Sequence, residues 1–143
     1  MLVKYLPKEY VSFKENVKKT TALKDKKKTL EERLSFLDTK SGLLYNGSDE
    51  EIYLITLNDY YNDDLTERIT EAFEKKDYKK YSVFTHALKS SSLGIGAIDM
   101  SEKAKSHELA AKSDDIDFVI SNYEDLLETY TKLRADIKGA LEI

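Results

Sequence analysis

Residues that interrupt regular structure are scarce in this chain, which has one proline and five glycines among 143 residues. Glycine and proline are the strongest local signals for turns and breaks, so their scarcity favours long continuous helices. No stretch shows the sustained alternation of apolar and polar residues that is typical of a half-buried strand. We therefore expect an all-α fold.

Aspartates that precede apolar residues at intervals of three and four mark the expected helix starts. Asp49, with Ser48 as the alternative cap, begins a short first helix. Four longer helices are expected to follow it, over about residues 63–76, 77–94, 98–113 and 114–137, with Asp77 as the cap of the second of these four and Asp114 or Asp115 as the cap of the last. Because the connections between these four are only a few residues long, we expect an antiparallel up-down-up-down four-helix bundle.

The charge is distributed unevenly along the chain. Residues 1–37 carry ten Lys and Arg against five Asp and Glu, a net +5, whereas residues 38–143 carry thirteen against twenty-two, a net −9. The first segment contains two short amphipathic pieces separated by the lysine-rich residues 24–28: Tyr10, Phe13 and Val17, then Leu30, Leu34 and Leu37. We interpret residues 1–37 as a partly helical extension or interdomain linker, and residues 38–143 as the functional domain.

Composition also disfavours several classes of function. An acidic domain is a poor partner for nucleic acid, and the lysines at 24–28 lack the interleaved aromatic residues of a nucleic-acid patch. No apolar run approaches the length of a membrane span, and charges interrupt residues 1–10, where a secretory signal would have its apolar region. The chain has no cysteine, which suits the cytoplasm. We expect a soluble cytoplasmic protein without nucleic-acid or membrane contacts.

His86 is the residue on which the functional interpretation depends. If Tyr81 marks the core side of its helix, His86 falls about 140° round from it at about 100° per residue, near Lys89, Ser90 and Leu93. The sequence thus predicts an exposed imidazole with an ammonium group one turn away. From this geometry alone, an ordinary solvent-facing histidine explains the position equally well.

Phosphoryl transfer is the chemistry that this arrangement suits. Imidazole has an unperturbed pKa of about 6.5, so a useful fraction is neutral and nucleophilic at cytoplasmic pH. A nearby lysine can offset the charge of the phosphoryl oxygens. Small residues after the histidine would let a partner's active site reach the ring: Ser90, Ser91, Gly94, Gly96 and Ala97.

The run from His86 to Ala97, His-Ala-Leu-Lys-Ser-Ser-Ser-Leu-Gly-Ile-Gly-Ala, resembles the signature of histidine-containing phosphotransfer domains. The resemblance covers roughly residues 38–135. It departs from the pattern at Ser90, where many members of the family have glycine. Its weaker parts are Gly42-Leu-Leu-Tyr, Asp49-Glu-Glu, Met100-Ser-Glu, Ala104-Lys, Asp115 and Leu126-Leu-x-x-Tyr130.

Carried over by position, the resemblance implies that His86 accepts the phosphoryl group and that Lys89 stabilises it. In some relatives a glutamine 22 residues after the histidine bonds to the ring, and here this place is taken by Glu108. A carboxylate that accepts from Nδ1–H would fix the tautomer with Nε2 free, although a solvated glutamate is the alternative. The residues expected to contact phosphate or partner are Ser90, Ser91, Leu93, Gly94 and Gly96.

The second histidine, His107, is expected to be structural. It lies on one helical stripe with apolar residues, which predicts partial burial and places it on a face opposite to that of His86. A metal site is therefore not expected, and Gly94-Ile-Gly96 is interpreted as a helix terminator because a nucleotide loop needs a third glycine and a preceding strand. The residues that share the stripe are Met100, Ala104 and Ala111.

The resemblance implies a phosphocarrier that is not itself an enzyme, with response-regulator receiver domains and a hybrid histidine kinase as partners. It implies no cofactor on this chain, since the receiver supplies Mg²⁺. The alternatives are a helical scaffold that docks without transfer, and the dimerising domain of a sensor kinase, which would need an acidic residue where Ala87 stands. Residues 1–10 resemble the segment that follows a receiver in hybrid kinases, so the chain is expected to be either the C-terminal part of such a kinase or a free-standing shuttle.

Overall fold

The computed structural model describes residues 29–142, all of whose regular structure is helical. The predicted all-α fold is confirmed for this part of the chain. The amphipathic piece at Tyr10–Val17, the lysines at 24–28 and the kinase-like residues 1–10 lie outside the described residues. The helices are α2 (Leu30–Arg33), α3 (Thr39–Tyr45), α4 (Glu50–Asn62), α5 (Thr66–Glu74), α6 (Tyr78–Gly94), α7 (Ile98–Lys112) and α8 (Ile116–Leu141).

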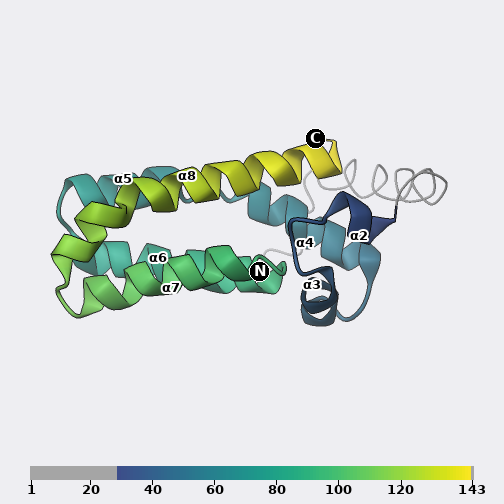
Figure 1. Ribbon diagram of the computed structural model, residues 1–143, viewed down its shortest axis with the longest axis horizontal. Helices are drawn as coiled ribbons and strands as arrows, with labels where there is room; N and C mark the ends of the chain where they lie inside the picture. The colour runs from purple at the N-terminus through teal and green to yellow at the C-terminus, as the bar shows by residue number, and fades with distance from the viewer. Residues whose placement is uncertain (1–28, 143) are drawn as a thin grey trace, which may run out of the picture.

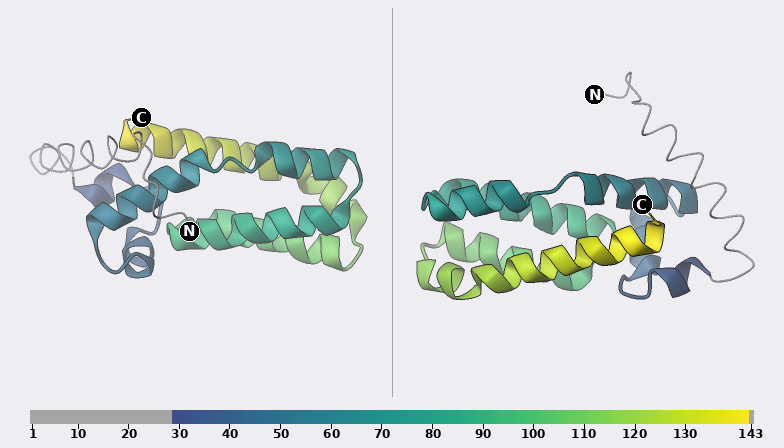
Figure 2. Two further views of the ribbon diagram at one scale, coloured as in Figure 1. Left: turned by 180° about the vertical axis from the view of Figure 1, so that it is seen from behind. Right: turned by 90° about the horizontal axis from the view of Figure 1, so that it is seen from above.

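The longer helices lie side by side in an elongated helical bundle (Figure 1). Helices α6 and α7 share the most extensive contact, and α8 packs against α7 and α4. Helices α4 and α5 follow one another along one edge of the molecule, with a break between them (Figure 2). The short helices α2 and α3 lie at one end (Figure 1). The α6–α7 pair carries the predicted site.

Three of the predicted aspartate caps are confirmed. The side chains of Asp49, Asp77 and Asp115 each accept a hydrogen bond from the backbone N–H three residues further on, at 3.1, 3.1 and 3.3 Å. Such bonds satisfy N–H groups that have no partner within the helix, which fixes the first turn. Ser48, the alternative cap, adopts a left-handed conformation with φ of 58° just before Asp49.

The break between α4 and α5 makes the second predicted helix shorter than expected, since α5 covers Thr66–Glu74 instead of 63–76. Side chains of α8 form hydrogen bonds with backbone groups at the break. The hydroxyl of Tyr130 accepts from Leu65 N at 3.1 Å and donates to Asp63 O at 3.3 Å. Arg134 Nη2 donates to Tyr61 O at 2.7 Å. Contacts from a distant helix therefore stabilise this break.

Part of the predicted extension belongs to the packed structure. Leu34 is 1% exposed and Leu37 is 9% exposed, and both join the hydrophobic core. Arg33 Nη2 also donates to Ala140 O at the end of α8. Residues 29–37 therefore pack against the bundle, and the boundary expected after residue 37 stays a prediction.

The turn between α6 and α7 is held by the segment before α3 and by α4. Asp38 N donates to Gly96 O at 2.8 Å, and Tyr53 Oη donates to Ile95 O at 2.7 Å. Gly96 has a φ of +82°, and a Cβ added there would lie 2.2 Å from Asp38 O. This position favours glycine both by its conformation and by its close backbone neighbour. Gly96 is buried and shapes this turn, while its predicted contact with a partner stays a prediction.

Candidate functional site

His86 lies in the middle of α6 and points away from the core. Its side chain is 56% exposed, whereas Tyr81 and Leu88 on the same helix are fully buried. This separation follows from the helical period, because residues about 140° apart on one helix face opposite environments. The predicted exposure of His86 is confirmed.

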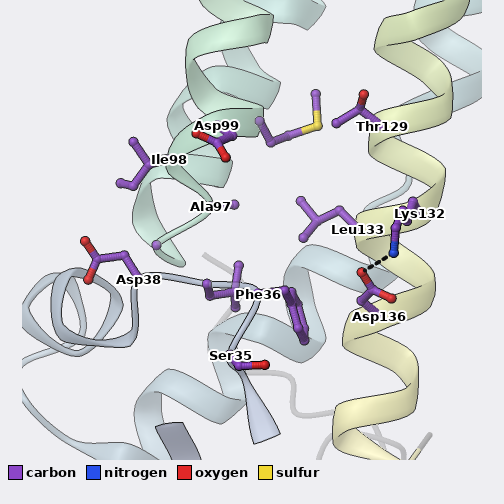
Figure 3. Close-up of a pocket in the computed structure, with 13 residues that line it drawn as sticks. Ser35, Phe36, Asp38, Ala97, Ile98, Asp99, Thr129, Lys132, Leu133 and Asp136 are labelled. Carbon is purple, nitrogen blue, oxygen red and sulfur yellow. Dashed lines mark hydrogen bonds and ion pairs between the residues drawn. The ribbon is translucent and has the colours of Figure 1, made fainter. Parts of the chain in front are cut away.

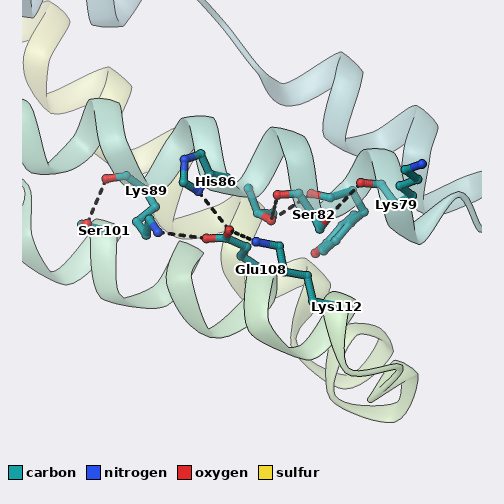
Figure 4. A network of polar contacts seen from close by, with 9 residues as sticks. Lys79, Ser82, His86, Lys89, Ser101, Glu108 and Lys112 are labelled. Carbon is teal, nitrogen blue, oxygen red and sulfur yellow. Dashed lines mark hydrogen bonds and ion pairs between the residues drawn. The ribbon is translucent and has the colours of Figure 1, made fainter.

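Glu108 on α7 holds the ring of His86 (Figure 4). His86 Nδ1 lies 2.9 Å from Glu108 Oε2, which confirms the predicted contact. An ionised carboxylate only accepts hydrogen bonds, so Nδ1 must carry the hydrogen. The neutral ring then has its lone pair on Nε2, and no hydrogen bond among the described residues engages that nitrogen.

Two lysines also contact this carboxylate, one of them at the oxygen that bonds to His86. Lys112 Nζ lies 2.7 Å from Oε2 of Glu108, and Lys89 Nζ lies 3.1 Å from Oε1. The carboxylate is only 4% exposed. Burial by itself would raise the pKa of Glu108, but the contacts from Lys112, Lys89 and His86 together outweigh it and lower the pKa to about 2. Glu108 is therefore an ionised, buried anchor with three cationic or hydrogen-donating neighbours.

Of the two lysines, the sequence analysis predicted Lys89 at the site but not Lys112. Lys89 was predicted as the phosphate-stabilising cation, and here it pairs with Glu108 while its backbone carbonyl accepts a bond of 2.9 Å from Ser101 Oγ on α7. Lys112 was missed, although its spacing of four residues from Glu108 is the usual signal for an ion pair along a helix. Its importance depends on Glu108 facing His86, which only the packing of α7 on α6 decides.

The remaining predicted contact residues are not all equally accessible. Ser90, Ser91 and Leu93 are exposed and Gly94 is half-buried, so these four lie on the surface of α6 beyond the histidine. Ser91 Oγ donates to Leu88 O, a bond that keeps it close to its own helix. Their predicted role with a phosphate or partner stays a prediction.

Two apolar side chains near the histidine were also missed. Val83, one turn before His86 on α6, is 57% exposed, and Leu109, next to Glu108 on α7, is 54% exposed. Neither follows the pattern of an amphipathic helix, where large apolar residues face the core. Both residues are therefore exposed on the two helices that carry His86 and Glu108.

His107 is confirmed as a structural residue and is more deeply buried than expected, at 1% exposure. Its Nδ1 shares a hydrogen bond of 2.8 Å with the hydroxyl of Tyr81, and its ring packs edge-on against Phe118 with centroids 5.2 Å apart. Burial lowers the pKa of His107 to about 4. The ring is therefore neutral at physiological pH and is inaccessible to a phosphoryl donor.

A surface cavity of about 580 Å³ lies elsewhere, between residues 35–38, the start of α7, and α8 (Figure 3). Apolar side chains such as Phe36 and Leu133 line it together with the ion pair of Lys132 and Asp136. His86, Lys89 and Glu108 do not line it. The cavity is thus separate from the predicted site.

Within residues 29–142, no three His, Cys, Asp or Glu residues are grouped so that they would hold a metal ion. The same residues include no helix that combines the length and the apolar character needed to cross a bilayer.

Compared with known proteins, the chain matches no family model, no curated protein and no solved structure.

Proposed function

We propose that this chain is a phosphocarrier that accepts a phosphoryl group on His86 from the aspartyl phosphate of a receiver domain and passes it to another receiver. The observation that carries the proposal is the exposed imidazole whose Nδ1 is bound to a buried, ionised carboxylate. That contact directs the lone pair of the neutral ring to Nε2 and orients it for attack.

In the transfer step, the lone pair of Nε2 forms a bond to phosphorus while the bond from phosphorus to the receiver's carboxylate oxygen breaks. Lys89, one turn from His86, is 27% exposed and can turn from Glu108 to the phosphoryl oxygens. Lys112 remains on Glu108 and keeps its charge balanced. The partner receiver supplies Mg²⁺ and most other catalytic groups, so this chain needs no cofactor and is not an enzyme by itself.

The charges round the histidine favour an acidic partner that carries a phosphoryl group. Residues 38–143 have a net charge of −9, yet Lys89 and Lys112 both lie beside His86, on the carboxylate of Glu108. Local positive charge steers an anionic active site towards the ring, and the exposed Val83 and Leu109 supply apolar contact beside it. We infer that response-regulator receivers and a hybrid histidine kinase are the partners, in the cytoplasm.

The proposal includes the finer architecture of the bundle. The α4–α5 pair, α6, α7 and α8 would run alternately up and down as an antiparallel four-helix bundle. Such an arrangement places His86 and Glu108 on neighbouring helices of a rigid framework, which suits a group that must present one atom to a large partner.

Incubation with a phosphorylated receiver domain and Mg²⁺ tests the proposal. We expect an acid-labile, base-stable phosphate on the wild-type chain and on His107→Gln, and none on His86→Gln, which should melt as the wild type does because the exposed ring contributes little packing. A His86→Gln variant that still accepts phosphate would refute the assignment. Binding of the receiver without any transfer would instead indicate a docking scaffold.

A further inference from the structure

The bond between His86 Nδ1 and Glu108 Oε2 also bears on how the phosphoryl group leaves. When the bond between Nε2 and phosphorus breaks, its electron pair returns to Nε2. If Nδ1 carries a proton, the ring departs as neutral imidazole. If Nδ1 has lost it, the ring departs as imidazolate, which is a much stronger base and a much poorer leaving group.

We propose, on the basis of the phosphorylation of His86 proposed above, that Glu108 keeps Nδ1 protonated while the ring carries phosphate. During acceptance, Nε2 binds phosphorus as the donor's carboxylate leaves. During donation, an oxygen of the acceptor carboxylate binds phosphorus as the electron pair returns to Nε2. The proton stays on Nδ1 throughout, so a complete cycle needs no proton exchange with solvent.

The charges that face the ring favour this assignment. A phosphorylated ring with a hydrogen on Nδ1 is cationic, and the carboxylate of Glu108 lies 2.9 Å from that nitrogen. Lys89 on α6 and Lys112 on α7 disfavour a further positive charge on the ring, but both ammonium groups contact the carboxylate before transfer (Figure 4), and Lys89 would then pair with the phosphoryl oxygens. An opposite charge in direct hydrogen-bond contact outweighs like charges that lie beyond it.

The anchor is suited to this task because it stays charged. A pKa of about 2 keeps Glu108 ionised at every pH at which the protein would work. A solvated glutamate would gain little from the same geometry, since water screens the interaction. Burial of Glu108 beside two lysines therefore gives the carboxylate a fixed place and a fixed charge.

The full chain is phosphorylated with phosphoramidate. The ³¹P chemical shift of the phosphohistidine is then followed from about pH 5 to about pH 10, because this range spans loss of the ring proton. We expect the titration midpoint of Glu108→Gln to lie at least about one pH unit below that of the wild type, because an opposite charge in contact shifts such equilibria by one to three units. Glu102→Gln is the matched control, since Glu102 lies exposed on the same helix and should leave the midpoint unchanged.

Equal midpoints for the wild type and Glu108→Gln, or an equal change in Glu102→Gln, would overturn the proposal. Failure to form phosphohistidine in the wild type would instead count against the function proposed for His86. Circular dichroism checks that Glu108→Gln is folded. Should it not fold, ¹⁵N-labelled wild type provides the second measurement: a protonated Nδ1 in the phosphorylated protein above neutral pH is expected, and an unprotonated one refutes the idea.

Discussion

Acid should destabilise the protein through His107 before it affects any carboxylate at the candidate site. Burial, the largest influence, lowers the pKa of His107 from 6.5 to about 4; Asp125 opposes this shift and Lys103 adds to it. In the unfolded chain the ring binds its proton as the pH falls through about 6.5, whereas in the folded chain it stays neutral until about pH 4. The free energy of unfolding therefore falls across this window as the pH is lowered.

The size of the effect follows from the two pKa values. Their difference corresponds to about 3 kcal/mol when the whole window has been crossed, and to about 2 kcal/mol between pH 7.5 and pH 5. Glu108 acts in a different window. Its pKa is lowered from 4.5 to about 2, so the stability that it contributes is present above pH 4.5 and is lost only between about pH 4.5 and pH 2.

Urea unfolding, followed by circular dichroism at a series of pH values, measures this dependence. His107→Gln removes the titrating ring and should flatten the profile between pH 7.5 and pH 5, whatever its own stability. His86→Gln is the control, because it retains His107 and should keep the wild-type slope. A wild type that is equally stable at both pH values, or an unchanged slope in His107→Gln, would refute the reasoning.

Two further predictions concern the site and the turn that follows it. Lys89→Ala should slow phosphoryl transfer by about thirty-fold, equivalent to about 2 kcal/mol, because it removes charge stabilisation but leaves the nucleophile. A single-turnover rate from a phosphorylated receiver, with Lys105→Ala as control, measures this, and a wild-type rate for Lys89→Ala contradicts it. Gly96→Ala should lower the free energy of unfolding by about 1–3 kcal/mol through its φ of +82° and its contact with Asp38 O, whereas Gly94→Ala, with nothing within 4 Å of its added Cβ, should be neutral or slightly stabilising. Chemical denaturation distinguishes the two glycines, and equal effects would contradict the role assigned to Gly96.

Local interactions explain what could be predicted from the sequence. Asp49, Asp77 and Asp115 begin helices because each side chain bonds to a backbone N–H three residues away, a contact that the order of residues specifies. The exposure of His86 follows from its angular distance from Tyr81 on one helix. Both follow from the order of a few neighbouring residues, once Tyr81 is taken to face the core.

Contacts between distant segments explain what could not be predicted. Leu34 was assigned to the extension, but it packs into the core, and Tyr130 of α8 bonds to the backbone just before α5. From the sequence, Gly96 was expected to be a small residue that a partner could contact, whereas in the structure the backbone of Asp38 lies directly against it. In each case the deciding neighbour is far away in the chain and leaves no local pattern.

The candidate site depends both on local sequence and on contacts between distant segments. The sequence by itself determined a helix that presents His86 with Lys89 one turn away, and the resemblance directed attention to Glu108. Only the packing of α7 on α6 decided that Glu108 is buried, ionised and 2.9 Å from the ring, with Lys112 as a further partner. A buried carboxylate is tolerated only where cations and hydrogen donors converge on it, and that convergence requires two helices to meet in one register.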